Sequence, residues 1–161
     1  MAYRIAFVCS GNICRSPTAE AIMRKLLADR GLDEAVEVDS FGIGDWHVGE
    51  RMDKRAAAAL RSRGYDIDHR ARVIDAYDIS ERGLVIAIDR DHEMDLRSMA
   101  WTAEDAEKVW LLRSYDPAAD GDLDIPDPYY GGTGGFEHVL ELIEAGCRGL
   151  VDEVTATLAT R

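Results

Sequence analysis

Cysteine is scarce in this sequence, and no stretch of it is apolar for long. Its 161 residues include only three cysteines, Cys9, Cys14 and Cys147. An odd count in a chain of this size argues against a disulfide framework and favours reduced thiols. No apolar run approaches the roughly 20 residues of a transmembrane helix, and the N-terminus lacks the small-residue cleavage site of a signal peptide. We therefore expect a cytoplasmic protein without a membrane segment.

Positive charge is also in short supply. The chain has 19 basic and 31 acidic residues, a formal net charge of -12. Such a protein repels nucleic acids and anionic membranes, so we expect neither as a partner. Any anion that it binds must be held by local chemistry. The hydrophobic content of 47 % is sufficient for one core, and we expect a single domain over residues 1–161.

Short apolar runs alternate with amphipathic patterns, which predicts an α/β fold around a parallel sheet. The expected strands cover residues 3–9, 36–43, 83–89 and 108–112. The expected helices run from Pro17, with Ser16 as N-cap, to Gly31, and over residues 53–64, 91–99 and 136–158. In the last helix, Gly146 and Gly149 could be weak points. Residues 114–135 show no period and predict a long loop, a feature that is often functional.

The segment CSGNICRS, residues 9–16, lies between the first strand and the first helix. In parallel α/β sheets, ligands bind beyond the carboxyl ends of the strands. Backbone N–H groups of this loop and the helix N-terminus can surround an anion, and the guanidinium of Arg15 can hold two phosphate oxygens. A nucleotide P-loop is excluded because no GxxxxGK[ST] pattern occurs. The expected phosphate-binding residues are Ser10, Gly11, Asn12, Ile13, Cys14, Arg15 and Ser16.

Cys9 would lie at the floor of this loop. A lone cysteine at a strand end is ordinarily a small packing residue. Here Arg15 follows six positions later and a helix begins, and helix N-termini and cations stabilise the anionic form of a thiol. We therefore expect Cys9 to be a thiolate that attacks phosphorus and forms a cysteinyl-phosphate intermediate.

Such a reaction is accelerated by an acid that protonates the leaving oxygen. In the long loop, Asp127 is held between Pro126 and Pro128 and is the preferred candidate, with Asp116 and Asp124 as rivals. A solvated turn aspartate is the alternative interpretation of Asp127.

Three aromatic residues are candidate pocket walls, although aromatics more often pack in cores. They are Trp46, Tyr129 and Tyr130. His69 could act as a base or as a hydrogen-bonding support, and a lone histidine is more often structural.

Together these motifs resemble the low-molecular-weight protein tyrosine phosphatases over nearly the whole chain. The shared segments are VCSGNICRSP at residues 8–17, VDS at 38–40, WHVGE at 46–50, HRAR at 69–72, IDRDH at 88–92 and DPYYGG at 127–132. The resemblance implies a flavodoxin-like three-layer sandwich with a four-stranded parallel sheet in the order 2-1-3-4. It also implies a monomer that needs no metal or cofactor, acts on phosphotyrosine proteins and is inhibited by inorganic phosphate and other oxyanions.

The same resemblance assigns roles. Cys9 becomes the nucleophile, Arg15 the phosphate ligand, and Asp127 first the acid and then the base. Cys14 matches a second thiol that can form a reversible disulfide with Cys9. Residues matching the support of the loop are Asn12, Ser16, Ser40 and His69. Residues matching the substrate pocket are Ile13, Trp46, Tyr129 and Tyr130.

Two positions depart from the pattern. Phe41 stands where a small residue is common, and His92 stands where many relatives carry asparagine, so the surroundings of Ser40 and Asp89 are expected to differ.

Three other functions share parts of this pattern. Thioredoxin-coupled arsenate reductases need two further cysteines after the third strand, and residues 80–100 contain none. Protein arginine phosphatases tend to carry threonine at the position of Ile13, whose bulk favours an aromatic ring. A binding module without turnover would have no use for both Cys9 and Asp127. The arginine phosphatase and the binding module remain the alternatives.

Overall fold

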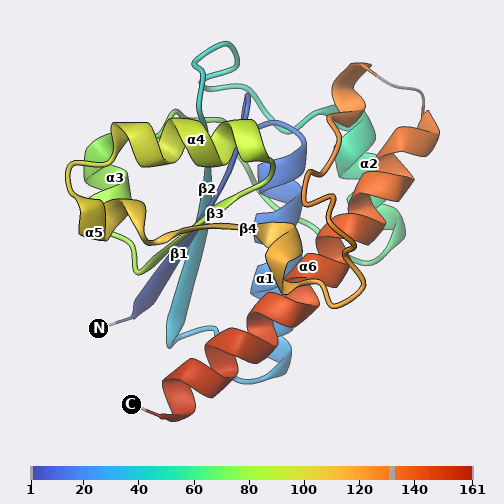
Figure 1. The fold of residues 1–161 in the computed structure, drawn as a ribbon. Coiled ribbons are helices and arrows are strands. Elements are labelled where there is room, and N and C mark those ends of the chain that lie inside the picture. The colour runs from blue at the N-terminus through green and yellow to red at the C-terminus, as the bar shows by residue number, and fades with distance from the viewer. Residues whose placement is uncertain (1, 131–132, 161) are drawn as a thin grey trace.

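The computed structural model describes residues 2–130 and 133–160, and it is built around a parallel sheet (Figure 1). The strands are β1 (Tyr3–Cys9), β2 (Val36–Gly42), β3 (Leu84–Ala87) and β4 (Val109–Leu111). All neighbours pair in parallel in the order β2-β1-β3-β4. The sheet order expected from the sequence is confirmed. The central position of β1 brings Cys9, paired with Gly42, to the carboxyl edge of the sheet.

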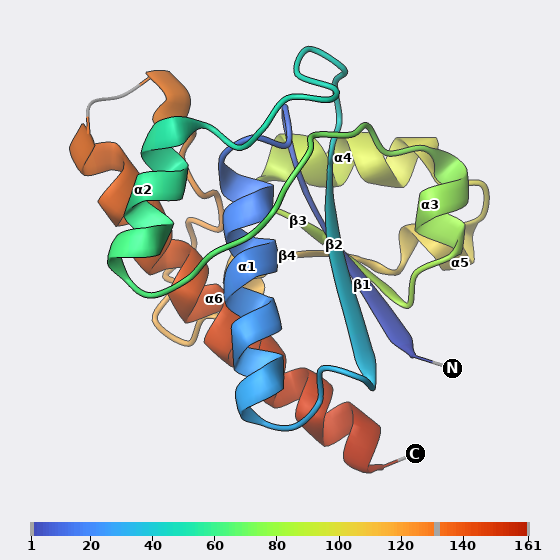
Figure 2. The ribbon, with the colours of Figure 1, turned by 180° about the vertical axis from the view of Figure 1, so that it is seen from behind.

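Helices cover both faces of the sheet (Figures 1 and 2). On one side lie α1 (Arg15–Asp29), α2 (Lys54–Ser62) and the long α6 (Thr133–Ala159). On the other lie α3 (Ala76–Ser80), α4 (Arg90–Met99) and α5 (Ala103–Ala106). The three layers agree with the flavodoxin-like sandwich. No helix of the described residues is long and apolar enough to cross a membrane.

The alternating side chains of β1 build one hydrophobic cluster on each face of the sheet. Ile5 and Phe7 are fully buried among residues of α1, α2 and α6. Ala6 and Val8 are fully buried against the layer of α3 and α4, which contributes Leu96. A strand buried on both faces needs the continuous apolar run that the sequence shows.

The first helix begins earlier than expected, and the prediction of Ser16 as its N-cap was wrong. α1 begins at Arg15, and its N-cap is Cys14, which makes no side-chain capping bond. Ser16 lies in the first turn, and its hydroxyl contacts Cys9 Sγ and the carbonyl of Phe41 instead. The tertiary site therefore takes the hydroxyl that a local cap would have used.

Other differences concern short elements. Helices α3 and α5, of five and four residues, were not predicted, and α6 begins at Thr133 rather than at residue 136. The loop over residues 114–135 includes two short 3-10 segments, η1 (Leu112–Tyr115) at its start and η2 (Pro128–Tyr130). Residues 131 and 132 of this loop lie outside the described residues.

Two glycines of α6 allow η1 to approach the helix closely. A Cβ on Gly149 would lie 1.8 Å from the carbonyl oxygen of Tyr115, and one on Gly146 would lie 2.6 Å from Leu112 Cγ. The helix is continuous through both glycines, and their missing side chains create the packing surface for η1. This contact fixes the start of the long loop that leads to Asp127.

Replacing Gly149 with alanine should destabilise the protein. The added methyl meets backbone, which cannot move aside like a flexible side chain, so we expect a loss of about 1 to 3 kcal/mol in the free energy of unfolding despite the better helix propensity of alanine. Urea denaturation of Gly149→Ala measures this loss. Gly135→Ala is the matched control in the same helix, since its Cβ would meet only ordinary contacts at 3.8 Å or more. Equal stability of the two variants would contradict the close approach.

Candidate active site

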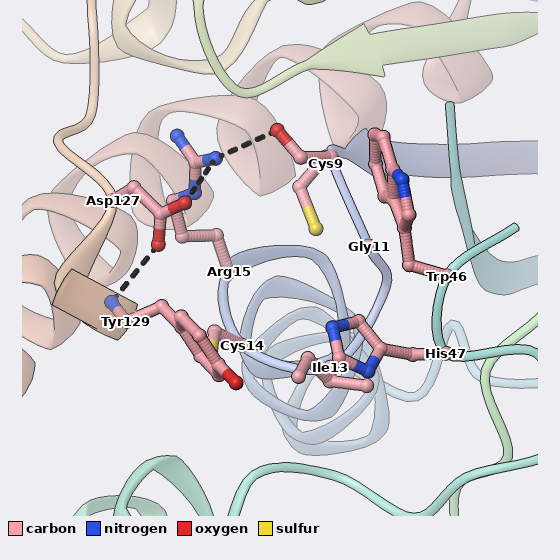
Figure 3. A pocket seen from close by; sticks show the side chains of 10 residues that line it. Cys9, Gly11, Ile13, Cys14, Arg15, Trp46, His47, Asp127 and Tyr129 are labelled. Carbon is pink, nitrogen blue, oxygen red and sulfur yellow. Dashed lines mark hydrogen bonds and ion pairs between the residues drawn. The ribbon is translucent and has the colours of Figure 1, made fainter. Parts of the chain in front are cut away.

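The loop between β1 and α1 (residues 10–14), called the phosphate loop after its expected ligand, forms the floor of a pocket of about 450 Å³ at the carboxyl edge of the sheet (Figure 3). It is anchored by backbone hydrogen bonds from Ile43 N to Cys9 O, from Gly44 N to Ser10 O and from Asp53 N to Ile13 O. The pocket is lined by Cys9, Ser10, Gly11, Ile13, Cys14, Arg15, Trp46, His47, Asp127 and Tyr129.

Cys9 is placed where the sequence predicted it, at the floor of this pocket. Its residue is 3 % exposed, and its Sγ lies 2.9 Å from Ser16 Oγ. Asn12 Nδ2 donates to the same Ser16 oxygen at 2.8 Å. Since Ser16 Oγ accepts from Asn12, its own proton is available to Cys9 or to the carbonyl of Phe41, which is 3.2 Å away. The arrangement can therefore stabilise a thiolate at Cys9.

The loop owes its shape to Asn12, the one described non-glycine residue with a positive φ, at 59°. Asparagine tolerates this left-handed backbone better than most residues. Its side chain also donates to Ser40 Oγ at 3.0 Å and accepts from the backbone N–H of Arg72 at 3.0 Å. Ser40 in turn donates to Glu20, whose buried carboxyl has a raised pKa because burial disfavours its charged form.

His69 contacts the loop from the segment after α2. Its Nε2 lies 2.6 Å from the carbonyl oxygen of Asn12, so this nitrogen carries the proton and donates it. Burial lowers the pKa of His69, which favours the neutral ring. His69 is not among the residues that line the pocket. This position fits support of the loop.

Arg15 is 3 % exposed and held on several sides. Its Nη1 donates to Asp89 Oδ2 at 3.0 Å and to the carbonyl of Ile125 at 2.9 Å. Its Nη2 lies 3.3 Å from Ser10 Oγ and 3.5 Å from Asp127 Oδ2. The guanidinium therefore links the phosphate loop to the long loop that carries Asp127.

Among the three candidate acids, the structure brings only Asp127 into the pocket lining. Its Oδ1 accepts from the backbone N–H of Tyr129 at 2.9 Å (Figure 3). Asp116 is buried and accepts from Ala118 N, whereas Asp124 accepts from Arg90 N. Neither rival lines the pocket.

Aromatic side chains flank the pocket mouth. Trp46 and Tyr129 lie on opposite sides of it in Figure 3, and the rim also includes His47, which sequence reasoning missed. The guanidinium carbon of Arg55 lies 5.5 Å from the centre of the Tyr129 ring. The side chain of Tyr130 lies outside the described residues, so its place in the pocket stays a prediction.

The sequence held a signal for two further residues of the site, one at the pocket rim and one that bonds to Arg15. His47 directly follows the candidate rim residue Trp46. Asp89 follows the third strand, and residues at the carboxyl ends of neighbouring parallel strands meet at one edge of a sheet.

Phe41 and His92, the two departures from the family pattern, both contact residues of the β1–α1 region. Phe41 is buried, with the guanidinium carbons of Arg72 and Arg82 lying 4.2 and 4.9 Å from the centre of its ring. Arg72 Nε also donates to the carbonyl of Ser40. The large ring at position 41 therefore takes part in the supporting layer. His92 contacts Ser10 directly, at 2.8 Å.

All three cysteines are free thiols. Burial, with the carboxylate of Asp53 as a second cause, raises the pKa of Cys14 well above its ordinary value. Burial likewise raises the pKa of Cys147, on α6. Within the part of the chain that the structure describes, no group of three or more histidine, cysteine or acidic side chains could hold a metal ion.

Comparison with known proteins identifies the family. The family model described as low molecular weight phosphotyrosine protein phosphatase matches residues 4–160. The chain belongs to this family. The resemblance predicted from the sequence, and the expectation of a hydrolase, are thereby confirmed.

Individual relatives agree with this assignment. A low molecular weight protein-tyrosine-phosphatase of Streptomyces coelicolor is 54 % identical over 155 residues, covering 96 % of this chain and 94 % of that protein. The crystal structure of YfkJ from Bacillus subtilis superposes with a TM-score of 0.91 at 39 % identity, covering 98 % of this chain and 97 % of the other. The structure of a Drosophila arginine phosphatase superposes with a TM-score of 0.86 at 34 % identity, covering 93 % of this chain and 96 % of the other.

Cys9 should react faster with alkylating agents than the other cysteines. Cys14 and Cys147 remain protonated at neutral pH, because their pKa values are raised, and only a thiolate is a good nucleophile. At pH 7, we expect iodoacetamide to label Cys9 at least about tenfold faster than either of them, with inorganic phosphate slowing the reaction. Peptide mass spectrometry over time measures the three rates. Labelling of Cys14 at a comparable rate would contradict the interpretation.

Proposed function

We propose that the protein is a phosphotyrosine protein phosphatase in which Cys9, Arg15 and Asp127 carry out the chemistry. The observation that carries the proposal is their convergence on one pocket: the thiol lies at its floor, and Arg15 Nη2 lies 3.5 Å from the carboxylate of Asp127. A nucleophile, an oxyanion ligand and an acid within one cavity are the parts that phosphate ester hydrolysis requires.

The reaction proceeds in two steps. The phosphate oxygens bind to the backbone N–H groups of the loop and to Arg15, and Cys9 Sγ attacks phosphorus as the ester P–O bond breaks. Asp127 protonates the departing phenolic oxygen, leaving cysteinyl phosphate and a carboxylate. That carboxylate then takes a proton from water, whose oxygen attacks phosphorus as the P–S bond breaks. Inorganic phosphate leaves, the thiolate is restored and Asp127 is again protonated.

The pocket walls support an aromatic substrate. Trp46 and Tyr129 offer flat faces to a ring, and the Ile13 side chain lines the pocket beside them. The phosphate site is deep, because Cys9 and Arg15 are both 3 % exposed. A long aryl ester can reach this depth while its peptide stays at the rim, which supports phosphotyrosine proteins as the substrates.

A protein arginine phosphatase is the second candidate, since the Drosophila relative is named for that activity. The apolar side chain of Ile13 gives a guanidinium no hydrogen-bond partner, which favours the phenol. A non-catalytic phosphoresidue-binding module is a weaker candidate, because Asp127 would place a carboxylate beside the bound anion without need.

The sequence and the family resemblance also support a domain organisation, a cellular location and inhibitors. We infer a single domain that acts as a monomer in the cytoplasm and uses no metal or cofactor. Inorganic phosphate and other oxyanions would compete for the loop. A reversible disulfide between Cys9 and Cys14 would protect the nucleophile from irreversible oxidation.

Loss of Asp127 should slow hydrolysis in a way that depends on the leaving group. With Asp127→Ala, we expect kcat/KM, which reports the step that forms cysteinyl phosphate, to fall about 10²-fold for phenyl phosphate, and less for p-nitrophenyl phosphate, whose less basic oxygen departs without a proton. Asp124→Ala is the matched control, since Asp124 is on the same loop but outside the pocket. Steady-state kinetics on both substrates measure the effect. Equal losses of kcat/KM with the two esters would exclude Asp127 as the acid, and full activity of Cys9→Ser would exclude the proposed nucleophile.

The substrate class can be tested with matched phosphopeptides. We expect kcat/KM for a phosphotyrosine peptide to exceed that for a phosphoarginine peptide of the same sequence by at least about tenfold, because Ile13 and the aromatic rim fit a ring. Ile13→Thr should lower the ratio of kcat/KM for the phosphotyrosine peptide to kcat/KM for the phosphoarginine peptide. Phosphate release measures both rates. Preference of the unmodified protein for phosphoarginine would overturn the substrate assignment while leaving Cys9 and Arg15 in place.

A further inference from the structure

His92 connects the helical layer of α4 to the phosphate loop. The residue is 3 % exposed and lies in the first turn of α4. Its Nε2 is 2.8 Å from the Oγ of Ser10, the residue that follows Cys9. Ser10 Oγ is also 3.3 Å from Arg15 Nη2. One hydroxyl therefore bridges a buried imidazole and the guanidinium of Arg15.

The directions of these hydrogen bonds follow from what each group can do. Arginine only donates, so Ser10 Oγ accepts from Arg15. The single proton of Ser10 remains available for His92 Nε2, and the hydrogen bond runs in this direction when Nε2 is unprotonated. Burial, which outweighs the opposing effect of the nearby Asp89 carboxylate, lowers the pKa of His92 and favours this neutral ring. In this tautomer the ring proton is on Nδ1, which lies 3.2 Å from Asp89 Oδ1 without a hydrogen bond of good geometry between them.

Asp89 is hydrogen-bonded to Arg15 and lies near the imidazole of His92. Its Oδ2 accepts from Arg15 Nη1 at 3.0 Å, and its Oδ1 faces His92. Arg15 Nη1 thus bonds to Asp89 and Nη2 to Ser10, in addition to their contacts with Ile125 and Asp127. Together these contacts fix the plane of the guanidinium, and His92 keeps the Ser10 hydroxyl turned so that a lone pair faces Arg15.

The side chain of His92 is not needed to begin α4. The helix is capped by Asp89, whose Oδ1 accepts from the backbone N–H of His92 at 3.0 Å, a bond available to any residue at this position except proline. In the described part of the chain, Nδ1 has no hydrogen-bond partner of good geometry, although Asp89 is near. The hydrogen bonding of this buried ring is therefore directed to Ser10 alone.

We propose that His92 is a positioning residue that acts through Ser10 to hold Arg15 in the orientation needed in the transition state. The proposal rests on the proposed function for the reaction concerned. A guanidinium that rotates still binds an anion, but it meets the equatorial oxygens of a pentacoordinate phosphorus less well. The effect should therefore fall on the transition state more than on the ground state.

The test compares His92→Leu, which removes the polar nitrogens, with His92→Gln, whose amide oxygen can accept from Ser10. For His92→Leu, we expect kcat/KM for p-nitrophenyl phosphate to fall about tenfold through kcat, and the affinity for vanadate, which adopts a pentacoordinate geometry, to fall by a similar factor. The affinity for inorganic phosphate should change by less than about twofold. His92→Gln should restore most of both losses.

Controls separate positioning from destabilisation of α4. Leu96→Val alters a fully buried side chain of the same helix and should lower the melting temperature without changing the vanadate affinity. Ser10→Ala removes the same bridge from the loop side and should give the same selective loss, even if His92→Leu does not fold. The double variant Ser10→Ala/His92→Leu should be no slower than the more impaired single variant.

Several results would overturn the proposal. These are unchanged kinetics of a folded His92→Leu, no rescue by His92→Gln, equal losses of vanadate and phosphate affinity, unchanged vanadate affinity of Ser10→Ala, or additive losses in the double variant. Oxyanion affinities are measured by calorimetry without turnover. If the parent protein failed to hydrolyse aryl phosphates, the proposed function would fail, while the vanadate comparison would still decide the role of His92.

Discussion

The geometry of the site depends on the side chain of Asn12, which closes the phosphate loop from the inside. When the backbone N–H groups of a loop face an anion, its remaining buried polar groups need hydrogen-bond partners from other parts of the chain. Asn12 meets this need with a left-handed backbone and with contacts to Ser16, Ser40 and the backbone of Arg72. Three separate chain segments thus meet at one amide. The orientation of Ser16, and through it the environment of Cys9, follows from this closure.

Much of the fold was predictable because its signals are local. A strand buried on both faces, β1, is a continuous apolar run, and the order of the motifs matched one family. The short helices α3 and α5 were missed because four or five residues are too few to show a hydrophobic period. Asp75 and Thr102 are residue types that commonly cap helices, so the sequence did contain a start signal for each. In the structure each accepts from a backbone N–H three positions later.

The site was predictable in its parts more than in its connections. Spacing alone placed Cys9 and Arg15 together, and two prolines singled out Asp127. The partners of Arg15 could not be deduced in the same way, because Asp89 and Ile125 are distant in sequence and one of them contributes only a carbonyl. Ser16 was misassigned for a related reason: local capping rules compete with tertiary hydrogen bonds, and here the tertiary bonds won.

The hydrogen bond from Arg15 to the carbonyl of Ile125 holds the long loop, which carries Asp127, against the loop between β1 and α1. In the proposed reaction, Arg15 and Asp127 therefore require little reorganisation as negative charge moves from the thiolate to the departing oxygen and, when the intermediate is hydrolysed, back to the thiolate.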